Sequence, residues 1–133
     1  MFSYIHEFRS FAQPLINQPI VMFKHPFSFE GRIRRTEYGL TVLIHWLITM
    51  GLNALFGKMS LYNLMTLKGV MWLSIVLPIA WFWFAQGAKR CHDRGNSGWF
   101  QLIPFYGLWM LFAEGDPGPN AYGEDPKREQ ILS

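Results

Sequence analysis

The chain has 133 residues, half of them hydrophobic and 17% aromatic, with a formal net charge of +3. This length fits one small unit and excludes a pair of ordinary soluble domains. A basic balance would suggest nucleic acid as the partner of a soluble protein. In so apolar a chain, the cations are better explained as topology signals and anchors for anionic lipid headgroups, so we expect no nucleic-acid partner. The single cysteine, Cys91, excludes an internal disulfide.

Three stretches carry no charged side chain, and each is about as long as a bilayer is thick. They are residues 38–57, 69–88 and 95–113. Because a helix rises about 1.5 Å per residue, about 20 residues cover the roughly 30 Å hydrocarbon core. We therefore predict an all-α, polytopic membrane protein, a small bundle of about three transmembrane helices. The expected helices are near 37–57, 66–89 and 97–113, in a membrane domain of residues 23–127.

Residues 1–22 precede this domain and contain Pro14 and Pro19. Since prolines end helices, we expect a loose arm here. A short amphipathic helix over residues 2–12, lying on the membrane surface, is the alternative. No cleavable signal peptide is evident, because a basic start followed by an unbroken apolar core is missing.

The first helix is expected to begin near Thr36 as the N-cap, with Glu37 in the first turn, where the helix dipole favours an anion. His45 and Asn53 lie inside the apolar run. Polar groups at that depth usually face other helices rather than lipid.

The second helix contains Pro78, and Lys89 and Arg90 close it. The third apolar stretch is weaker, since Pro104 and Gly107 interrupt it. It can span as a broken helix, or dip into the membrane and return. We favour spanning, because nothing else would cover its backbone polar groups in lipid. Residues 114–133 are rich in glycine, proline and acid, which predicts turns and a solvated tail.

The distribution of Lys and Arg predicts the orientation. Of the 12 cationic residues, eight precede the first helix or lie between the second and third, and four lie on the other side. This bias places the N-terminus in the cytoplasm, and three spans would then place the tail outside.

Two polar clusters fall on the predicted cytoplasmic side, at the start of the first helix and the end of the second. The candidate ligand-binding or headgroup-binding residues are Arg32, Arg35, Glu37, Arg90, His92, Asp93, Ser97 and Trp99. Arginine forks bind phosphate and carboxylate, while the acidic residues supply counter-ions. The simpler interpretation is that these residues tie the helix ends together and fix the topology. The sequence favours it, because arginines beside a membrane are routine.

His92 and Asp93 could form an acid–base pair, because a carboxylate can orient an imidazole. Neighbours in sequence seldom point at each other, however, and no nucleophile motif accompanies them, so we assign no catalytic residue. The histidines and Cys91 show none of the paired spacings of zinc sites. We therefore expect no metal and no cofactor.

Three longer patterns carry a resemblance to a known family. They are Phe29-x-Gly31-Arg32-Ile33-x-Arg35-x-Glu37-Tyr38, then Arg90-x-His92-Asp93-x-Gly95-x-Ser97-Gly98-Trp99, then Gly115-x-x-Gly118-x-Asn120-x-Tyr122-Gly123-x-Asp125-Pro126. In this order, over roughly residues 23–127, they resemble the opening, central and closing motifs of the bacterial domain of unknown function 805 family. The chain departs from the family at Lys89, Cys91 and Gly39, where arginine, leucine and an aromatic residue are usual.

The resemblance implies a small protein of the bacterial inner (cytoplasmic) membrane, and it supplies no mechanism. Met22-Phe23-Lys24 is similar to a usual family start, so residues 1–21 are expected to be a dispensable upstream extension. The resemblance alone adds candidate residues from the closing motif. They are Asn120, Tyr122, Gly123, Asp125 and Pro126.

Three functions stay open at this point. The leading hypothesis is a non-enzymatic membrane-organising or protein-interaction module, with lipids and either further copies or another membrane protein as partners. The second is a transporter or channel subunit, whose path would be marked by His45, Asn53 and Pro78. The third is an enzyme or binder of lipid headgroups that uses Arg32, Arg35, Arg90, His92 and Asp93.

Overall fold

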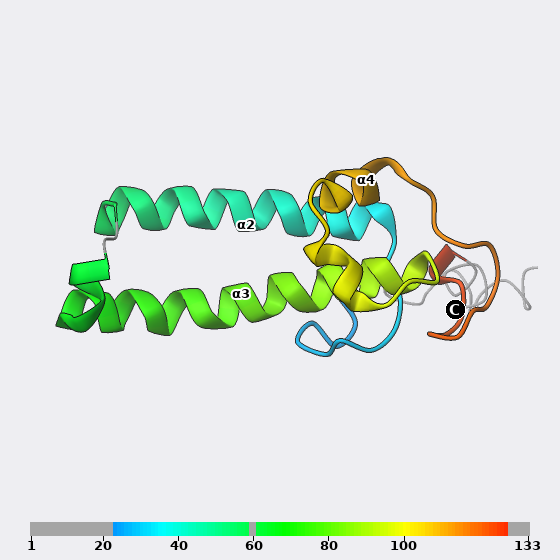
Figure 1. Ribbon diagram of the computed structural model, residues 1–133, viewed down its shortest axis with the longest axis horizontal. Helices are drawn as coiled ribbons and strands as arrows, with labels where there is room; N and C mark the ends of the chain where they lie inside the picture. The colour runs from blue at the N-terminus through cyan, green and yellow to red at the C-terminus, as the bar shows by residue number, and fades with distance from the viewer. Residues whose placement is uncertain (1–22, 59–60, 128–133) are drawn as a thin grey trace, which may run out of the picture.

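The computed structural model describes residues 23–58 and 61–127, and the regular elements in these ranges are all helical. Two long helices, α2 (Arg35–Phe56) and α3 (Leu67–Asp93), run antiparallel along the long axis of the molecule (Figure 1). The 3₁₀ helix η1 (Leu61–Met65) joins them at one end. The 3₁₀ helix η2 (Gly98–Leu102) and α4 (Tyr106–Phe112) lie beside the other end. The predicted all-α fold with about three helices is confirmed; the predictions for residues 1–22 fall outside the described residues.

The pair α2 and α3, here called the stem, has ends that follow from local chemistry. The N-cap of α2 is the extended residue Arg34 rather than Thr36, and its side chain makes no capping bond. The Arg34 side chain donates instead to the carbonyl of Pro126, from Nε at 3.1 Å and from Nη2 at 3.0 Å. Glu37 stands in the first turn, as expected. The helix ends where Gly57 takes φ +72°, a conformation that favours glycine.

The return into α3 depends on a cap and a glycine. The Thr66 hydroxyl accepts a hydrogen bond from the Gly69 N–H at 3.3 Å. A Cβ on Gly69 would overlap the backbone of Asn63 and Leu64 in η1. Glycine therefore lets η1 lie directly on the first turn of α3, which closes the helical hairpin.

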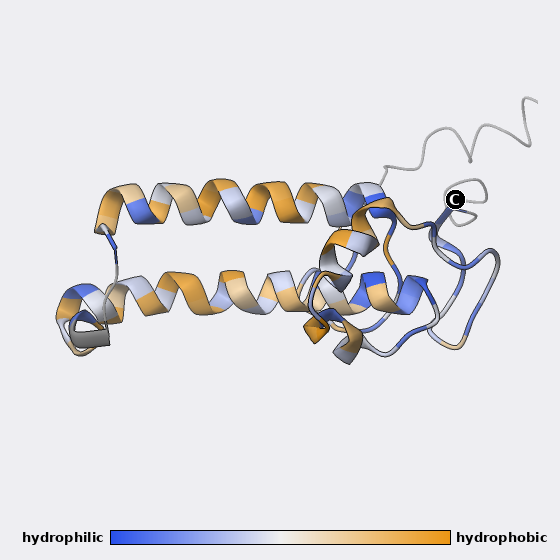
Figure 2. Ribbon diagram, turned by 45° about the horizontal axis from the view of Figure 1, so that its top comes forward, coloured by the Kyte–Doolittle hydropathy of each residue, from blue (hydrophilic) through white to orange (hydrophobic). Residues whose placement is uncertain are grey.

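Both stem helices are long enough to cross a bilayer. Their 22 and 27 residues correspond to about 33 and 40 Å, against roughly 30 Å of hydrocarbon. In the most apolar window of each, only 6% of the residues are buried within the chain. The apolar colouring runs along the length of both helices in Figure 2. Their apolar side chains therefore face outward, as in helices that contact lipid.

The third apolar stretch is not a spanning helix. Residues 98–112, here called the third segment, hold only η2 and α4, and the seven residues of α4 measure about 10 Å. Pro104 and Phe105 separate these two elements, and Phe105 takes the left-handed conformation with φ +64°. The expectation that this stretch spans is wrong. The segment is broken into two short elements, and its entry into the membrane stays a prediction.

The chain after the third segment returns to the start of α2. Arg32 donates to the carbonyls of Gly118 and Gly123, and Arg34 to that of Pro126. Residues 114–127 thus lie at the same end as residues 24–34, and the prediction of a tail on the opposite side of the membrane is wrong. We call this packed end, made of residues 24–34, 86–97 and 113–127, the polar head.

The small core lies where the polar head meets the stem. Ile33, Tyr38, Cys91 and Met110 are buried together, from the segment before α2 and from α2, α3 and α4. The Cys91 sulfur lies 3.5 Å from the sulfur of Met110. Packing is therefore concentrated at one end of the molecule, while most of the stem stays exposed.

Candidate functional site

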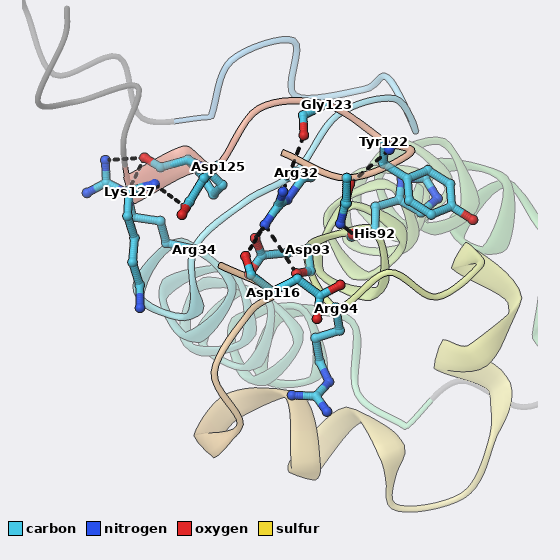
Figure 3. A network of polar contacts seen from close by, with 12 residues as sticks. Arg32, Arg34, His92, Asp93, Arg94, Asp116, Tyr122, Gly123, Asp125 and Lys127 are labelled. Carbon is cyan, nitrogen blue, oxygen red and sulfur yellow. Dashed lines mark hydrogen bonds and ion pairs between the residues drawn. The ribbon is translucent and has the colours of Figure 1, made fainter. Parts of the chain in front are cut away.

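The Asp93 carboxylate in the polar head lies between two arginines, Arg32 and Arg90, and Figure 3 shows Arg32 pointing toward it. Arg32 Nε donates to Oδ1 at 3.1 Å, and Arg90 Nη1 donates to Oδ2. All three side chains are buried, the arginines at 1% exposure and Asp93 at 5%. Buried charges are stable only when they are paired and hydrogen-bonded, and here each carboxylate oxygen has its own guanidinium. This triad joins the segment before α2 to the last turn of α3.

The remaining donors of Arg32 bind the returning chain. Nη1 donates to the Gly118 carbonyl at 2.7 Å and to the Gly123 carbonyl at 3.2 Å. Nη2 donates to the Asp116 carbonyl at 2.7 Å. Asp93 contributes its backbone as well, since its carbonyl accepts from the Asp116 N–H at 2.7 Å. A single side chain therefore holds three points of residues 116–123.

Arg90 binds the third segment in the same manner. Its Nε donates to the Met110 carbonyl at 3.0 Å, and Nη2 donates to the Ala113 carbonyl. Nη1 also lies 3.4 Å from the Ile33 carbonyl. All three guanidinium nitrogens are occupied by the protein. The triad is therefore a clasp that fastens both later segments to the stem, with every guanidinium nitrogen of Arg32 and Arg90 hydrogen-bonded within the protein.

His92 is engaged separately from Asp93. Its Nδ1 lies 3.2 Å from the Gly31 carbonyl, which can only accept, so Nδ1 carries the proton. The ring stacks on Tyr122, with centroids 4.0 Å apart and planes 3° from parallel. Asn120 donates from Nδ2 to the His92 carbonyl at 2.8 Å. The two adjacent residues thus point to different partners, and the contacts shown do not make them an acid–base pair.

Every closing-motif candidate has a place in the polar head. Asn120 and Tyr122 contact His92, and the Gly123 carbonyl accepts from Arg32. The Asp125 carboxylate accepts from the backbone N–H groups of Gly118 at 3.1 Å and Lys127 at 2.9 Å. Pro126, which is buried, accepts from Arg34. These residues act in the fold by shaping the loop that the arginines hold.

The other predicted site residues do not join the triad. Arg35 is half exposed, with Nη1 3.8 Å from Glu114 Oε1. Glu37 acts electrostatically on Lys89 of α3. Ser97 precedes η2 without a side-chain capping bond, and Trp99 is largely exposed. The sequence predicted these residues as one candidate site. In the fold they separate into the buried clasp and a partly exposed rim around it.

Lys89 and Gln86 belong to the polar head, although neither was among the candidate site residues predicted from the sequence. Lys89 Nζ donates to the carbonyls of Lys24 at 2.9 Å and His25 at 2.6 Å, and Gln86 Nε2 donates to that of Pro26 at 2.7 Å. A signal was present, because the two residues are three apart and so share one face of the helix. Polar side chains on one face at the end of an apolar run indicate a covering segment.

Of the residues proposed for a transport path, His45 contacts the neighbouring helix, whereas Asn53 and Pro78 are exposed on the stem. The His45 ring stacks on Trp83 of α3 with centroids 5.3 Å apart, and its Nδ1 is buried without a hydrogen-bond partner among the described residues. Within residues 23–58 and 61–127, no group of three or more His, Cys, Asp or Glu side chains is placed to hold a metal ion.

Comparison with known protein families gives a match over most of the described residues. Residues 26–124 match the family described as "Protein of unknown function (DUF805)". The chain belongs to this family. The match begins at Pro26, which Gln86 binds, and ends just after Gly123, which Arg32 binds. It therefore covers the stem, the third segment and most of the returning loop, and the resemblance to this family is confirmed.

The names of curated relatives indicate the cellular location of proteins in this family. "Inner membrane protein YhaH" of Escherichia coli (strain K12) is 32% identical over 116 residues, which are 81% of this chain and 94% of the relative. "Inner membrane protein YhaI" of the same strain is 33% identical over 113 residues, or 80% and 92%. "Uncharacterized protein YiiR" is 32% identical over 87 residues, or 65% and 55%. No solved structure matches the chain. With its two long apolar helices, this DUF805 chain is an inner-membrane protein.

Proposed function

We propose that this DUF805 protein is a non-enzymatic, membrane-organising module. In this proposal the stem crosses the inner membrane twice, and the third segment is embedded in one leaflet only. The observation that carries the proposal is the exposure of apolar side chains along the third segment, at one end of the stem. A protein of this shape occupies more area in one leaflet than in the other.

The third segment carries many exposed apolar side chains. Trp99 is 79% exposed, Phe105 82% and Phe112 76%. Further exposed apolar side chains lie between them: Phe100, Leu102, Ile103, Leu108 and Trp109. Large exposed apolar areas are rare on proteins surrounded by water and mark contact with lipid or with another protein. Lipid is the better supported occupant, because the neighbouring stem helices are also apolar and exposed.

The depth of the third segment follows from its contacts with the stem. Gly98 packs on Ala88, and Gln101 packs on Gly87. From Gly87 to the end of α3 at Asp93 the helix rises about 9 Å. This is less than the roughly 15 Å thickness of one hydrocarbon leaflet. The third segment is therefore suited to reach into the near leaflet and not across the bilayer.

The cations support an orientation with the polar head in the cytoplasm. Eight described Lys and Arg residues lie at the polar-head end. They are Lys24, Arg32, Arg34, Arg35, Lys89, Arg90, Arg94 and Lys127. The opposite end carries Lys58 and Lys68. By the positive-inside rule, both the segment before α2 and the returning loop are then cytoplasmic, and the third segment lies in the cytoplasmic leaflet.

A non-catalytic role is supported by how the acid–base candidates are used. Asp93 is divided between two arginines and His92 is held by Gly31 and Tyr122, so neither is presented to a substrate. We include in the proposal that copies assemble with each other or with another membrane protein. Asn53 supports this, because it is exposed on α2, where an amide gains from a partner on a neighbouring helix.

Spin-label depth measurements test the one-leaflet insertion. Nitroxide labels at Phe105→Cys and Leu108→Cys, in a Cys91→Ala background, should collide with oxygen far more than with a water-soluble nickel chelate. Their depth should be shallower than that of a label at Leu47→Cys in the stem. The control label at Ala121→Cys, exposed in the returning loop, should collide with the nickel chelate. Labels at 105 and 108 that behave like the label at 121 would refute the insertion.

Reporter fusions test the orientation. A cytoplasmic reporter fused after Ser133 should be active, and alkaline phosphatase inserted after Lys58 should be active outside. The reverse pattern would refute the cytoplasmic polar head. Location of both reporters on the same side of the membrane would refute the two-span arrangement.

A further inference from the structure

Arg94 differs from the two neighbouring buried arginines in how few of its donors have acceptors. Arg32 and Arg90 donate from all three of their guanidinium nitrogens. Among the described residues, Arg94 makes one hydrogen bond, from Nη1 to the Glu114 carbonyl at 2.6 Å. Its Nε is buried and has no partner there. Because buried donors in folded proteins are nearly always hydrogen-bonded, Arg94 lacks an acceptor.

Arg94 lies at the boundary between the polar head and the third segment. It follows the last residue of α3, and its guanidinium carbon is 5.8 Å from the ring centroid of Trp109 in α4. In Figure 3 its side chain extends away from Asp93, on the side of the short helices. Trp109 is exposed and belongs to the surface that we place in the leaflet. An arginine stacked on such a tryptophan is at the level where lipid phosphates lie.

A second cation stands beside this position. Arg35 Nη1 lies 3.8 Å from Glu114 Oε1, while Arg94 binds the backbone of the same residue. Lys127 Nζ is 4.0 Å from the same carboxylate oxygen. The Glu114 carboxylate therefore faces two cations, Arg35 and Lys127, and no carboxylate among the described residues forms an ion pair with Arg94. This excess of positive charge next to a lipid-facing surface favours an anion.

We propose that Arg94 and Arg35 bind the phosphate of an anionic lipid headgroup in the leaflet that holds the third segment. The depth part of this inference rests on the proposed function. The phosphate would supply the acceptor that the Arg94 guanidinium lacks, in the bidentate geometry that arginine favours. The sequence suggested a headgroup site that includes Arg32 and Arg90, which are buried. Our proposal instead places the site at Arg94 and Arg35 on the partly exposed rim. Inorganic phosphate offers the same oxygens, and the test separates the two sources.

Native mass spectrometry of the full chain, with equal amounts of phosphatidylglycerol and phosphatidylcholine added, tests the site. The wild-type chain should retain phosphatidylglycerol, because its headgroup carries a net negative charge. Arg94→Gln should lower that retention roughly tenfold or more, since hydrogen bonds to charged groups are the strong ones. Lys68→Gln removes the same charge at the far end of the stem and should retain the lipid as the wild type does.

Several results would overturn the site. One is equal retention of phosphatidylglycerol by Arg94→Gln and the wild type. Another is release of the signal by millimolar inorganic phosphate, which would assign the arginines to a soluble anion. If circular dichroism shows that Arg94→Gln loses helix, the half-exposed Arg35→Gln takes its place, with a severalfold loss expected and unchanged retention counting against the site.

The spin-label depths keep this inference separate from the proposed function. Lipid retention that depends on Arg94, together with labels at 105 and 108 in water, would support the site and refute the insertion. Labels at leaflet depth together with no dependence on Arg94 would refute the site and support the insertion.

Discussion

Asp93→Asn removes one negative charge from the centre of the clasp and leaves the shape of the side chain nearly unchanged. Arg32 and Arg90 then stay buried with no carboxylate between them. Their carbonyl partners, at Gly118 and Met110 for example, remain but carry no full charge. The variant therefore isolates the electrostatic part of the clasp from its packing.

The magnitude follows from burial. Removing one partner of a buried ion pair costs about 3–5 kcal/mol, because the other charge is left uncompensated. Asparagine keeps one acceptor oxygen for one arginine, but its amide N–H₂ meets the other guanidinium, donor against donor. We expect a loss of about 3 kcal/mol in the free energy of unfolding, or roughly a hundredfold in the folding equilibrium.

Reversible unfolding in mixed detergent micelles, followed by circular dichroism, measures this loss. Glu124→Gln is the matched control, because it removes one carboxylate from an exposed position of the returning loop. Exposed substitutions of this kind stay within about 0.5 kcal/mol of the wild type. An Asp93→Asn variant as stable as Glu124→Gln would show that the carboxylate is not what holds the arginines, and the clasp would have to rest on the carbonyls alone.

Two further predictions concern the polar head. Gly115→Ala should lower the free energy of unfolding by about 1–3 kcal/mol, because a Cβ there would overlap the Asp93 carboxylate. The control Gly51→Ala, where a Cβ meets open space in α2, should leave the stability unchanged or raise it by up to about 1 kcal/mol, and the reverse order of the two variants would contradict the packing. The hydrogen bond from the Lys127 backbone N–H holds the pKa of Asp125 below its ordinary value. The contribution of the ionised Asp125 carboxylate to stability is therefore complete above the ordinary pKa of about 3.9. This contribution is lost as the pH falls through the lower pKa of the folded state. A titration of the Lys127 amide resonance with its midpoint at or above the ordinary pKa would contradict this.

The sequence predicted the stem because hydropathy and length alone decide which helices suit a bilayer. It also showed that Arg32, Arg90 and Asp93 need partners, since unpaired charges next to lipid are costly. It did not show which partners they take. Arg32 binds carbonyls at Asp116, Gly118 and Gly123, and backbone carbonyls have no signature in a sequence. For the same reason, the returning loop read as a solvated tail although its backbone completes the clasp.

The third segment was misassigned because composition records how apolar a stretch is and not where its ends are held. The buried side chain of Arg90 determines where the end of the third segment is held. Arg90 stands in the last turn of α3, at the polar-head end, and it donates to the carbonyls of Met110 and Ala113. A helix that left this end near Gly95 and spanned the membrane would carry Met110 about 20 Å away, since 15 residues separate them. Arg90 would then keep Asp93 but lose the carbonyls that satisfy its other nitrogens. A broken segment returns these carbonyls to Arg90. The Met110 carbonyl is free to accept because the last four carbonyls of a helix have no partner inside it, and Ala113 follows the end of α4. The buried arginine and the short α4 thus require each other, and together they confine the apolar surface of the third segment to one end of the stem.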